Sequence, residues 1–145
     1  MSSVAPIPTD WCDAVIKVLK RGDYGECRWY PRARQDWMQL GMTHQAYELL
    51  IQTLNQREVW GEQIYMTFQL PNPPKGENQA TYAFLCKHPF NPTVQLYAKI
   101  GLYDGHVCLD IFSLHNDYTN ELIKKIAAAK TKLKAAQKKV RKHGN

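Results

Sequence analysis

Four residues of types suited to phosphate chemistry occur in two neighbouring apolar stretches of this 145-residue sequence. From Val94 to Leu102 apolar and polar residues alternate, so Tyr97 and Lys99 fall on one face of an expected strand. Ser113 and His115 end the next stretch. Histidine can move a proton near neutral pH, lysine can stabilise phosphate charge, and tyrosine can donate a hydrogen bond or stack on a base. Together these residues suit metal-free cleavage of a phosphodiester bond.

The second stretch, VCLDIFSLH, does not alternate throughout. Continued alternation would bury Ser113 and His115 and expose their apolar neighbours. One extra residue near Ile111 and Phe112, a β-bulge, would instead turn Asp110, Ser113 and His115 to the polar face. Bulges re-aim side chains beside active sites, so this pattern favours a site here. An ordinary solvated sheet face with the same residues is the alternative.

Other kinds of site have little support in the sequence. The carboxylates do not cluster and the five histidines are dispersed, so we expect no metal site, and without a glycine-rich phosphate loop we expect no cofactor. The four cysteines have no zinc-like or disulfide-like spacing, which favours reduced thiols. No signal peptide or stretch of the ~20 apolar residues that span a membrane is present, so we expect a cytoplasmic protein with no membrane contact.

The net charge of +6 is concentrated at one end of the chain. Residues 121–145 contain nine Lys or Arg and one acidic residue, whereas residues 1–120 contain ten basic and twelve acidic side chains. We therefore expect one folded domain over 1–120 and a basic amphipathic helix or tail over 121–145.

The hydrophobic periodicity predicts an α+β fold, with N-terminal helices packed on a small antiparallel sheet and a basic C-terminal helix. The first helix is expected to have Thr9 or Asp10 as its N-cap and to stop at Gly22, and the second is expected around residues 46–54. Strands are expected over 62–70, 81–87, 94–102 and 107–115, with a tight hairpin at Asp104-Gly105 between the last two. A proline-rich loop, 71–78, separates the first two strands.

Residues 21–37 are expected to form a basic and aromatic connector between the two helices. Its arginines, which include Arg28, Arg32 and Arg34, could clamp single-stranded RNA while the interleaved aromatic rings stack on bases. Equally, its tryptophans could anchor the core and its arginines could pair with the protein's own carboxylates. The sequence leaves this choice open.

Several stretches, taken in order, resemble a known family. They are DAVIKVLKRGDYG, RARQDWMQLGMTHQAYELLIQTLNQREVW, VQLYAKIGL and VCLDIFSLH. Their order and spacing, over roughly residues 12–116, resemble the MqsR-type toxins of bacterial type II toxin–antitoxin systems, which belong to the RelE-like group of mRNA interferases. The resemblance is to the superfamily rather than to one toxin.

This resemblance implies a RelE/MqsR-like fold and a metal-independent endoribonuclease that inhibits translation and growth and is neutralised by a cognate antitoxin. The RNA's own 2′-hydroxyl would attack the adjacent phosphate and leave a 2′,3′-cyclic phosphate. Tyr97 matches the family's strand tyrosine, Lys99 its lysine two residues on, and His115 the basic residue that follows the Ser113-hydrophobic pair. The implied partners are single-stranded mRNA, the antitoxin and, as a further candidate, the ribosome.

One departure from the family lies at Gly61, which follows Trp60 where the family often has a lysine. Arg57, Lys87 or a connector arginine could substitute for that lysine. The full set of expected RNA-binding residues is therefore Arg28, Arg32, Arg34, Arg57 and Lys87. The rival interpretations are a catalytically inactive RNA- or ribosome-binding module, a DNA-binding protein, or a partner or immunity-type protein of the same fold.

The apolar stripe of the C-terminal helix thins toward its end, so its second half is expected to protrude. That half could contact RNA or the ribosome, keep the protein soluble, or bind an antitoxin helix. His88, which precedes a proline, is expected to have a structural role.

Overall fold

The structure, a computed structural model, describes residues 4–23, 26–39, 46–65, 80–88, 90–91, 93–103, 106–113 and 116–143. Its elements are β1 (Val4–Pro6), α1 (Thr9–Arg21), β2 (Cys27–Trp29), α2 (Pro31–Gln39), α3 (Ala46–Leu54), β3 (Trp60–Gln63), β4 (Ala80–Lys87), β5 (Gln95–Tyr103), β6 (His106–Ser113) and α4 (Asn116–His143). The fold is α+β, as the sequence predicted.

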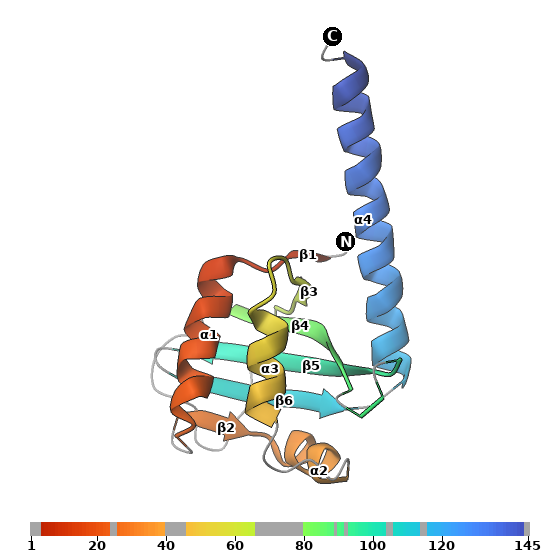
Figure 1. The fold of residues 1–145 in the computed structure, drawn as a ribbon. Helices are drawn as coiled ribbons and strands as arrows, with labels where there is room; N and C mark the ends of the chain where they lie inside the picture. Colours follow the sequence, from red (N-terminus) through yellow and green to blue (C-terminus); the bar gives the residue numbers. More distant parts are fainter. Residues whose placement is uncertain are drawn as a thin grey trace.

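The strands form one sheet in the order β1-β3-β4-β5-β6-β2 (Figure 1). Each neighbouring pair is antiparallel except β2 and β6, which run parallel. In Figure 1, α1 and α3 lie side by side over one face of the sheet, and α4 rises from one end of it. The two terminal elements, β1 and α4, are in contact.

The main core lies between the sheet and the helices α1 and α3. Leu96, Ala98 and Ile100 of β5 belong to it and are fully buried. Trp11 of α1 packs edge-on against Tyr82 of β4, with ring centroids 4.9 Å apart. Because alternate residues of a strand point to opposite faces, the residues between those of β5 must face away from this core.

The first helix ends as expected, but its N-cap is Pro8, without a side-chain capping hydrogen bond, rather than Thr9 or Asp10. It runs from Thr9 to Arg21 and stops at Gly22, whose φ of 62° is left-handed. The amide of Gly22 donates to the carbonyl of Val18, which closes the helix end. The second expected helix is α3, and β4, β5 and β6 match three of the four expected strands.

The first expected strand, 62–70, is only partly testable. In the described residues β3 begins earlier, at Trp60, and ends at Gln63. Residues 66–70, the loop 71–78 and the hairpin residues Asp104-Gly105 lie outside the described residues. Tyr103 pairs with His106, however, so the connection between β5 and β6 has the expected two-residue length.

The interpretation of residues 21–37 as a connector is wrong. They contain the strand β2 and most of the helix α2, which begins at Pro31. Trp29 donates from Nε1 to the hydroxyl of Tyr47 over 2.9 Å, and Trp37 is buried in the core. Trp37 is thus a core anchor, as one of the two alternatives proposed, and Trp29 is half-buried against the core. β2 was missed because a three-residue strand paired to a distant segment leaves no periodic pattern.

The C-terminal helix divides into a seated half and a protruding half. Leu122 is buried against the sheet, with Ile126 half-buried beside it. Residues 131–138 are all exposed, and Figure 1 shows the helix extending well beyond the sheet. The expected protrusion is therefore confirmed. In the part of the chain that the structure describes, no helix has the length and apolar character required to cross a membrane.

Candidate functional site

Tyr97 and Lys99 share one face of β5, as predicted, but that face is not open. Each side chain is only 8 % exposed. Tyr97 joins Ala83 and Leu122 in a second, smaller buried cluster on the side of the sheet away from the main core. The expectation that these residues lie on an exposed polar face is therefore wrong. Leu122 and Tyr118 of α4 pack against Tyr97.

The β-bulge that the sequence predicted is present. Lys99 pairs with Ile111, but the next residue, Ile100, pairs with Leu109. The register shift leaves Asp110 as the extra residue of β6, immediately before the expected position. Beyond the shift the backbone of Ser113 lies opposite Tyr97. His115 lies outside the described residues, so the structure brings together the positions of Tyr97, Lys99 and Ser113 only.

Ring packing and ion pairs hold α4 over this face. The rings of Tyr97 and Tyr118 have centroids 5.5 Å apart. Lys125 donates from Nζ to Glu62 of β3 over 2.7 Å and lies 3.4 Å from Glu121. The pKa of Lys125 is raised, first by its hydrogen bond to Glu62, so the ammonium form is favoured. The ion pair with Glu62 links α4 to β3.

A groove opens beside Tyr97, between α4 and the ends of β4 and β5. It has a volume of about 450 Å³. Leu85, which lines it, lies directly across from Tyr97, and Gln95 lies two residues before Tyr97 on the same strand. The described residues that line the groove are Thr53, Gln56, Glu58, Val59, Trp60, Leu85, Lys87, Gln95, Ile123, Ile126, Ala127 and Lys130. The groove is thus an accessible extension of the sheet face that carries the candidate residues.

Trp60 and Lys130 are site candidates that the sequence prediction missed. Lys130 places Nζ 5.5 Å from the centroid of the Trp60 ring. The indole N–H of Trp60 donates to the carboxylate of Glu58, which fixes the ring. The sequence signal was weak, since a single lysine in a lysine-rich helix cannot be matched to a distant tryptophan before the fold is known.

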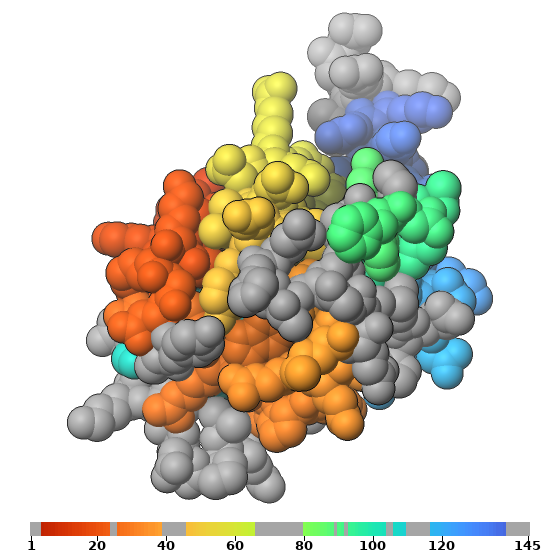
Figure 2. All heavy atoms as spheres, turned by 60° about the horizontal axis from the view of Figure 1, so that its bottom comes forward, coloured from red at the N-terminus to blue at the C-terminus, as the bar shows by residue number. Residues whose placement is uncertain are grey.

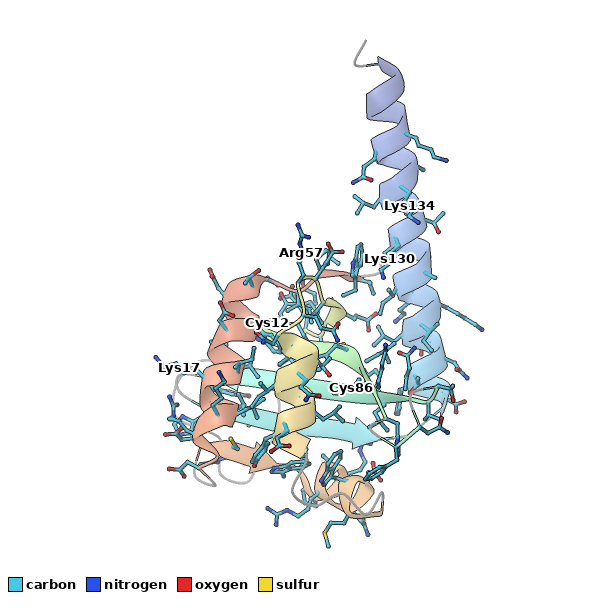
Figure 3. The ribbon with its side chains drawn as sticks, in the orientation of Figure 1. Cys12, Lys17, Arg57, Cys86, Lys130 and Lys134 are labelled. Atoms are coloured by element: carbon cyan, nitrogen blue, oxygen red, sulfur yellow. The ribbon has the colours of Figure 1, made fainter. Side chains whose placement is uncertain are left out.

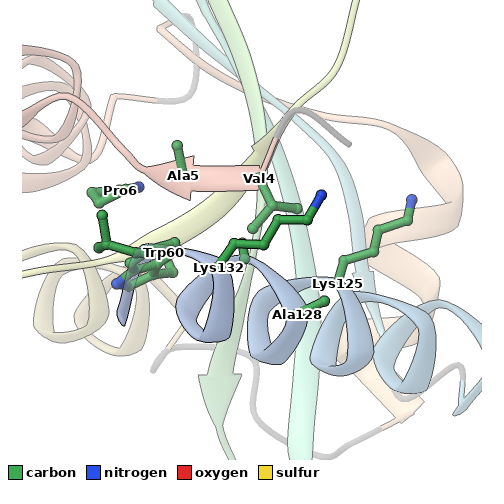
Figure 4. Close-up of a pocket in the computed structure, with 9 residues that line it drawn as sticks. Val4, Ala5, Pro6, Trp60, Lys125, Ala128 and Lys132 are labelled. Atoms are coloured by element: carbon green, nitrogen blue, oxygen red, sulfur yellow. The ribbon is translucent and has the colours of Figure 1, made fainter. Parts of the chain in front are cut away.

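A second hollow lies on the other flank of α4, against β1 (Figure 4). Its volume is about 640 Å³, and Trp60 lines it as well. Figure 4 shows the side chains of Lys125 and Lys132 rising from α4 toward β1. Trp60 therefore lines both the groove and this second hollow, which lie on opposite flanks of α4.

Gly61 shows why no lysine can follow Trp60 in this chain. A Cβ at position 61 would lie 2.6 Å from the carbonyl oxygen of Ala83 and 2.6 Å from Cδ1 of Ile7. Neither the strand backbone nor the buried Ile7 can yield that much space. The glycine at this position is therefore required by the packing of β3 against β4 and Ile7.

The expected RNA-binding residues fall into two groups. Lys87 lines the groove, and Arg57 stands between the lining residues Gln56 and Glu58. Figure 3 shows Arg57 near the end of α3 and Lys130 on the side of α4 that faces it. By contrast, Arg28 belongs to β2, at the other edge of the sheet.

Arg32 and Arg34 belong to α2, and both are exposed. Figure 2 shows α2 and α3 on one face of the molecule, with α4 projecting behind them. The structure therefore brings Lys87 to the groove. Arg57 neighbours two lining residues in the sequence without lining the groove itself, and the three former connector arginines lie at the β2 edge of the sheet.

His88 has the structural role expected of it. Its Nδ1 accepts hydrogen bonds from the amides of Phe90 and Asn91 over 3.1 and 3.2 Å, so it holds the turn between β4 and β5. Among the described residues, no three His, Cys, Asp or Glu side chains gather closely enough to hold a metal ion.

The four cysteines are buried free thiols. Burial raises the pKa of Cys86 to about 12 and the pKa values of Cys12 and Cys27 to about 11. Because the thiolate is the reactive form, these three thiols are unsuited to nucleophilic chemistry near neutral pH.

Comparison with known proteins adds no relative to this geometry. No family model, curated protein or solved structure matched the chain.

Proposed function

We propose that this protein is a toxin of the RelE/MqsR-like kind, an endoribonuclease that cuts single-stranded mRNA without a metal ion. In this proposal it inhibits translation and growth when free, and a cognate antitoxin neutralises it. The ordered resemblance of residues 12–116 to that superfamily supports the assignment. Arg57, Lys87 and the basic helix supply the positive charge that RNA phosphates attract.

One structural observation carries the proposal. The sheet face that bears Tyr97 and Lys99 continues into an open groove with Trp60, Lys87 and Lys130 along it. An aromatic ring among cations is the combination that holds single-stranded nucleic acid. The confirmed bulge supports the same location, since it sets Ser113 opposite Tyr97.

The chemistry uses the RNA's own nucleophile. The 2′-oxygen attacks the neighbouring phosphorus and loses its proton to a base, a role that we assign to His115. The bond from phosphorus to the 5′-oxygen breaks, and that oxygen takes up a proton and leaves as a 5′-hydroxyl. Lys99 would stabilise the pentacoordinate phosphate, and Tyr97 would position it by a hydrogen bond. The products are a 2′,3′-cyclic phosphate and a 5′-hydroxyl.

This mechanism requires the first turns of α4 to move. Tyr97 and Lys99 are each 8 % exposed, and Leu122 and Tyr118 of α4 lie against Tyr97. A phosphate in contact with Lys99 would occupy space beside this seated helix. RNA bound in the groove would therefore have to displace α4 before cleavage.

A second candidate function is RNA binding without cleavage, and the burial of Tyr97 and Lys99 favours it. In that case α4 would be a permanent part of the sheet's cover. The groove and the protruding helix would then hold RNA, while the β5 face would have only a packing role.

Cleavage by point variants decides between the two. We expect the purified chain to cut end-labelled single-stranded RNA, and Tyr97→Phe, Lys99→Met and His115→Ala each to slow cutting at least about tenfold, since positioned proton transfer contributes ~10²–10⁴ in rate. Lys99→Met keeps the side-chain length and removes the charge. Lys17→Ala, on the far side of α1 in Figure 3, is the matched control.

Two outcomes would count against the proposal. Folded variants that all cut like the parent would place the site elsewhere. A parent that binds RNA without cutting it would support the binding module. Growth arrest on expression alone, relieved by co-expression of the neighbouring gene, would support the antitoxin part of the proposal.

A further inference from the structure

The groove beside Tyr97 has the shape and chemistry of a site for a single unpaired base. Trp60 lies on one wall, on β3, and Lys130 lies opposite it on α4, 5.5 Å from the ring centroid. Val59 and Leu85 also line the groove and contribute apolar surface. A volume of about 450 Å³ is within the range of small-ligand sites.

The charges along the groove are arranged for an anion. Lys87 and Lys130 are both exposed and lie on opposite sides, one on β4 and one on α4. Glu58 is the one carboxylate among the described lining residues, and it already accepts the hydrogen bond of the Trp60 indole. The groove thus presents two ammonium groups beside an aromatic ring whose own polar atom is satisfied.

The contact between Lys130 and Trp60 could instead have a purely structural role, but it would add little to the stability of the fold. Lys130 is exposed and Trp60 is half-exposed, so the contact encloses little surface. An exposed cation–π contact is weak, so a stacked base can replace it. The lysine would then move from the ring to the phosphate beside that base.

We propose that the groove binds one unpaired base of single-stranded RNA, stacked on Trp60, with its flanking phosphates against Lys87 and Lys130. The inference rests on the proposed function in taking RNA as the ligand. Cleavage itself is not required for it. Because a base in a duplex is already stacked and paired, this site selects unpaired RNA.

Binding of a strand that cannot be cut tests the inference separately from cleavage. The probe is a fluorescently labelled, fully 2′-O-methylated single-stranded RNA, which lacks the attacking hydroxyl, and fluorescence anisotropy gives its affinity for the full chain. We expect Trp60→Ala and Trp60→Leu to weaken binding about tenfold, as loss of base stacking does. Trp60→Phe keeps an aromatic face and should stay within about threefold of the parent. Tyr65→Ala, which removes an aromatic ring that is 77 % exposed outside the groove, is the matched control.

Lys130→Ala tests the opposite wall on an exposed helix position where folding is not at risk. The slope of log affinity against log salt concentration should be smaller in magnitude by about 0.7 in this variant, which is the contribution of one phosphate contact on a single strand. Lys17→Ala should leave the slope unchanged. A methylated duplex of the same sequence should show no response to Trp60→Ala.

The results separate this inference from the proposed function. Weaker binding of Trp60→Ala and Trp60→Leu supports the base site even if the parent never cuts RNA. Binding of Trp60→Leu equal to that of the parent overturns the base site even if the parent does cut. If the Trp60 variants fail to fold, an unchanged salt slope for Lys130→Ala overturns the inference and a flatter slope supports it.

Discussion

Lys99 and Tyr97 are two residues of polar types in nearly closed surroundings. Water is largely excluded there, so a charge on the lysine would interact with a phosphate more strongly than it could at the surface. Such an environment suits stabilisation of a crowded phosphate intermediate. Because both residues are buried, RNA cannot reach them in this conformation. These two residues alone therefore do not define a working site.

The residues of the site differed in how far the sequence could predict them. Tyr97 and Lys99 were assigned correctly to one strand face, because strict alternation fixes that relation. The burial of Tyr97 could not be predicted, since it depends on where the separate helix α4 folds back. Trp60 and Lys130 are 70 positions apart along the chain, and only the three-dimensional fold brings them together.

The buried thiols predict a loss of stability at alkaline pH. An unfolded thiol has a pKa of about 8.5, whereas burial raises the pKa of Cys86 to about 12. Above pH 8.5 the unfolded chain therefore binds fewer protons than the native one, and the free energy of unfolding falls as the pH rises. For Cys86 the loss between pH 7.5 and 10 is about 2 kcal/mol.

Urea unfolding at pH 7.5 and pH 10 measures this loss. Cys86→Ala should lose about 2 kcal/mol less than the parent between the two pH values, because it lacks one raised thiol. The small cavity left by alanine lowers stability equally at both. An identical fall in parent and variant would show that Cys86 is not responsible.

At the scale of elements, the longer and more regular segments were predictable and the short ones were not. α1, α3, β4, β5 and β6 carry repeated apolar patterns, and the bulge in β6 was visible as a fault in such a pattern. β1 and β2 have three residues each, too few to show a period. α2 did carry a signal, since its buried residues Ala33 and Trp37 are four apart, but its basic composition obscured it.

Access to Tyr97 depends on the packing of α4 against the sheet. Leu122 is 2 % exposed, whereas Leu133, further along the same helix, is 46 % exposed. Leu122→Ala should therefore lower the free energy of unfolding by about 2–5 kcal/mol. Leu133→Ala, with the same change in helix propensity, should stay within about 0.5 kcal/mol of the parent.

Thermal and urea unfolding of the two leucine variants provide the comparison. Equal effects would show that α4 is not held through Leu122. Under the proposed function, Leu122→Ala should also cut RNA faster than the parent, because a loosened helix uncovers Tyr97 and Lys99. A rate unchanged in a clearly destabilised variant would argue against the requirement that α4 moves.

At the scale of the whole molecule, charge and fold are separated. The sheet and its helices form the body, and the protruding half of α4 carries a large share of the cations. This division was predictable, because a run of lysines with a thinning apolar stripe cannot be packed into a core. The position of that helix above the groove was not predictable from its composition.

Removal of the protruding segment should change binding without changing the fold. A chain ending at Leu133 keeps Lys130 and loses five Lys or Arg residues. We expect its unfolding temperature to stay close to that of the full chain, since residues 134–138 are all exposed. Its affinity for RNA should be lower. The slope of log affinity against log salt concentration should be smaller in magnitude by about 0.7 for each lost phosphate contact. A large drop in unfolding temperature would show that the segment belongs to the core.

The central claim is that the RNA's own 2′-hydroxyl does the cutting, and one substrate tests it directly. A single-stranded RNA with a mapped cut site is compared with the same strand carrying a 2′-deoxy nucleotide on the 5′ side of that cut, in excess EDTA. We expect the all-RNA strand to be cut to a 2′,3′-cyclic phosphate and the substituted strand not to be cut there. Cutting of the deoxy site at an undiminished rate, or activity lost with EDTA and restored by Mg²⁺, would contradict it.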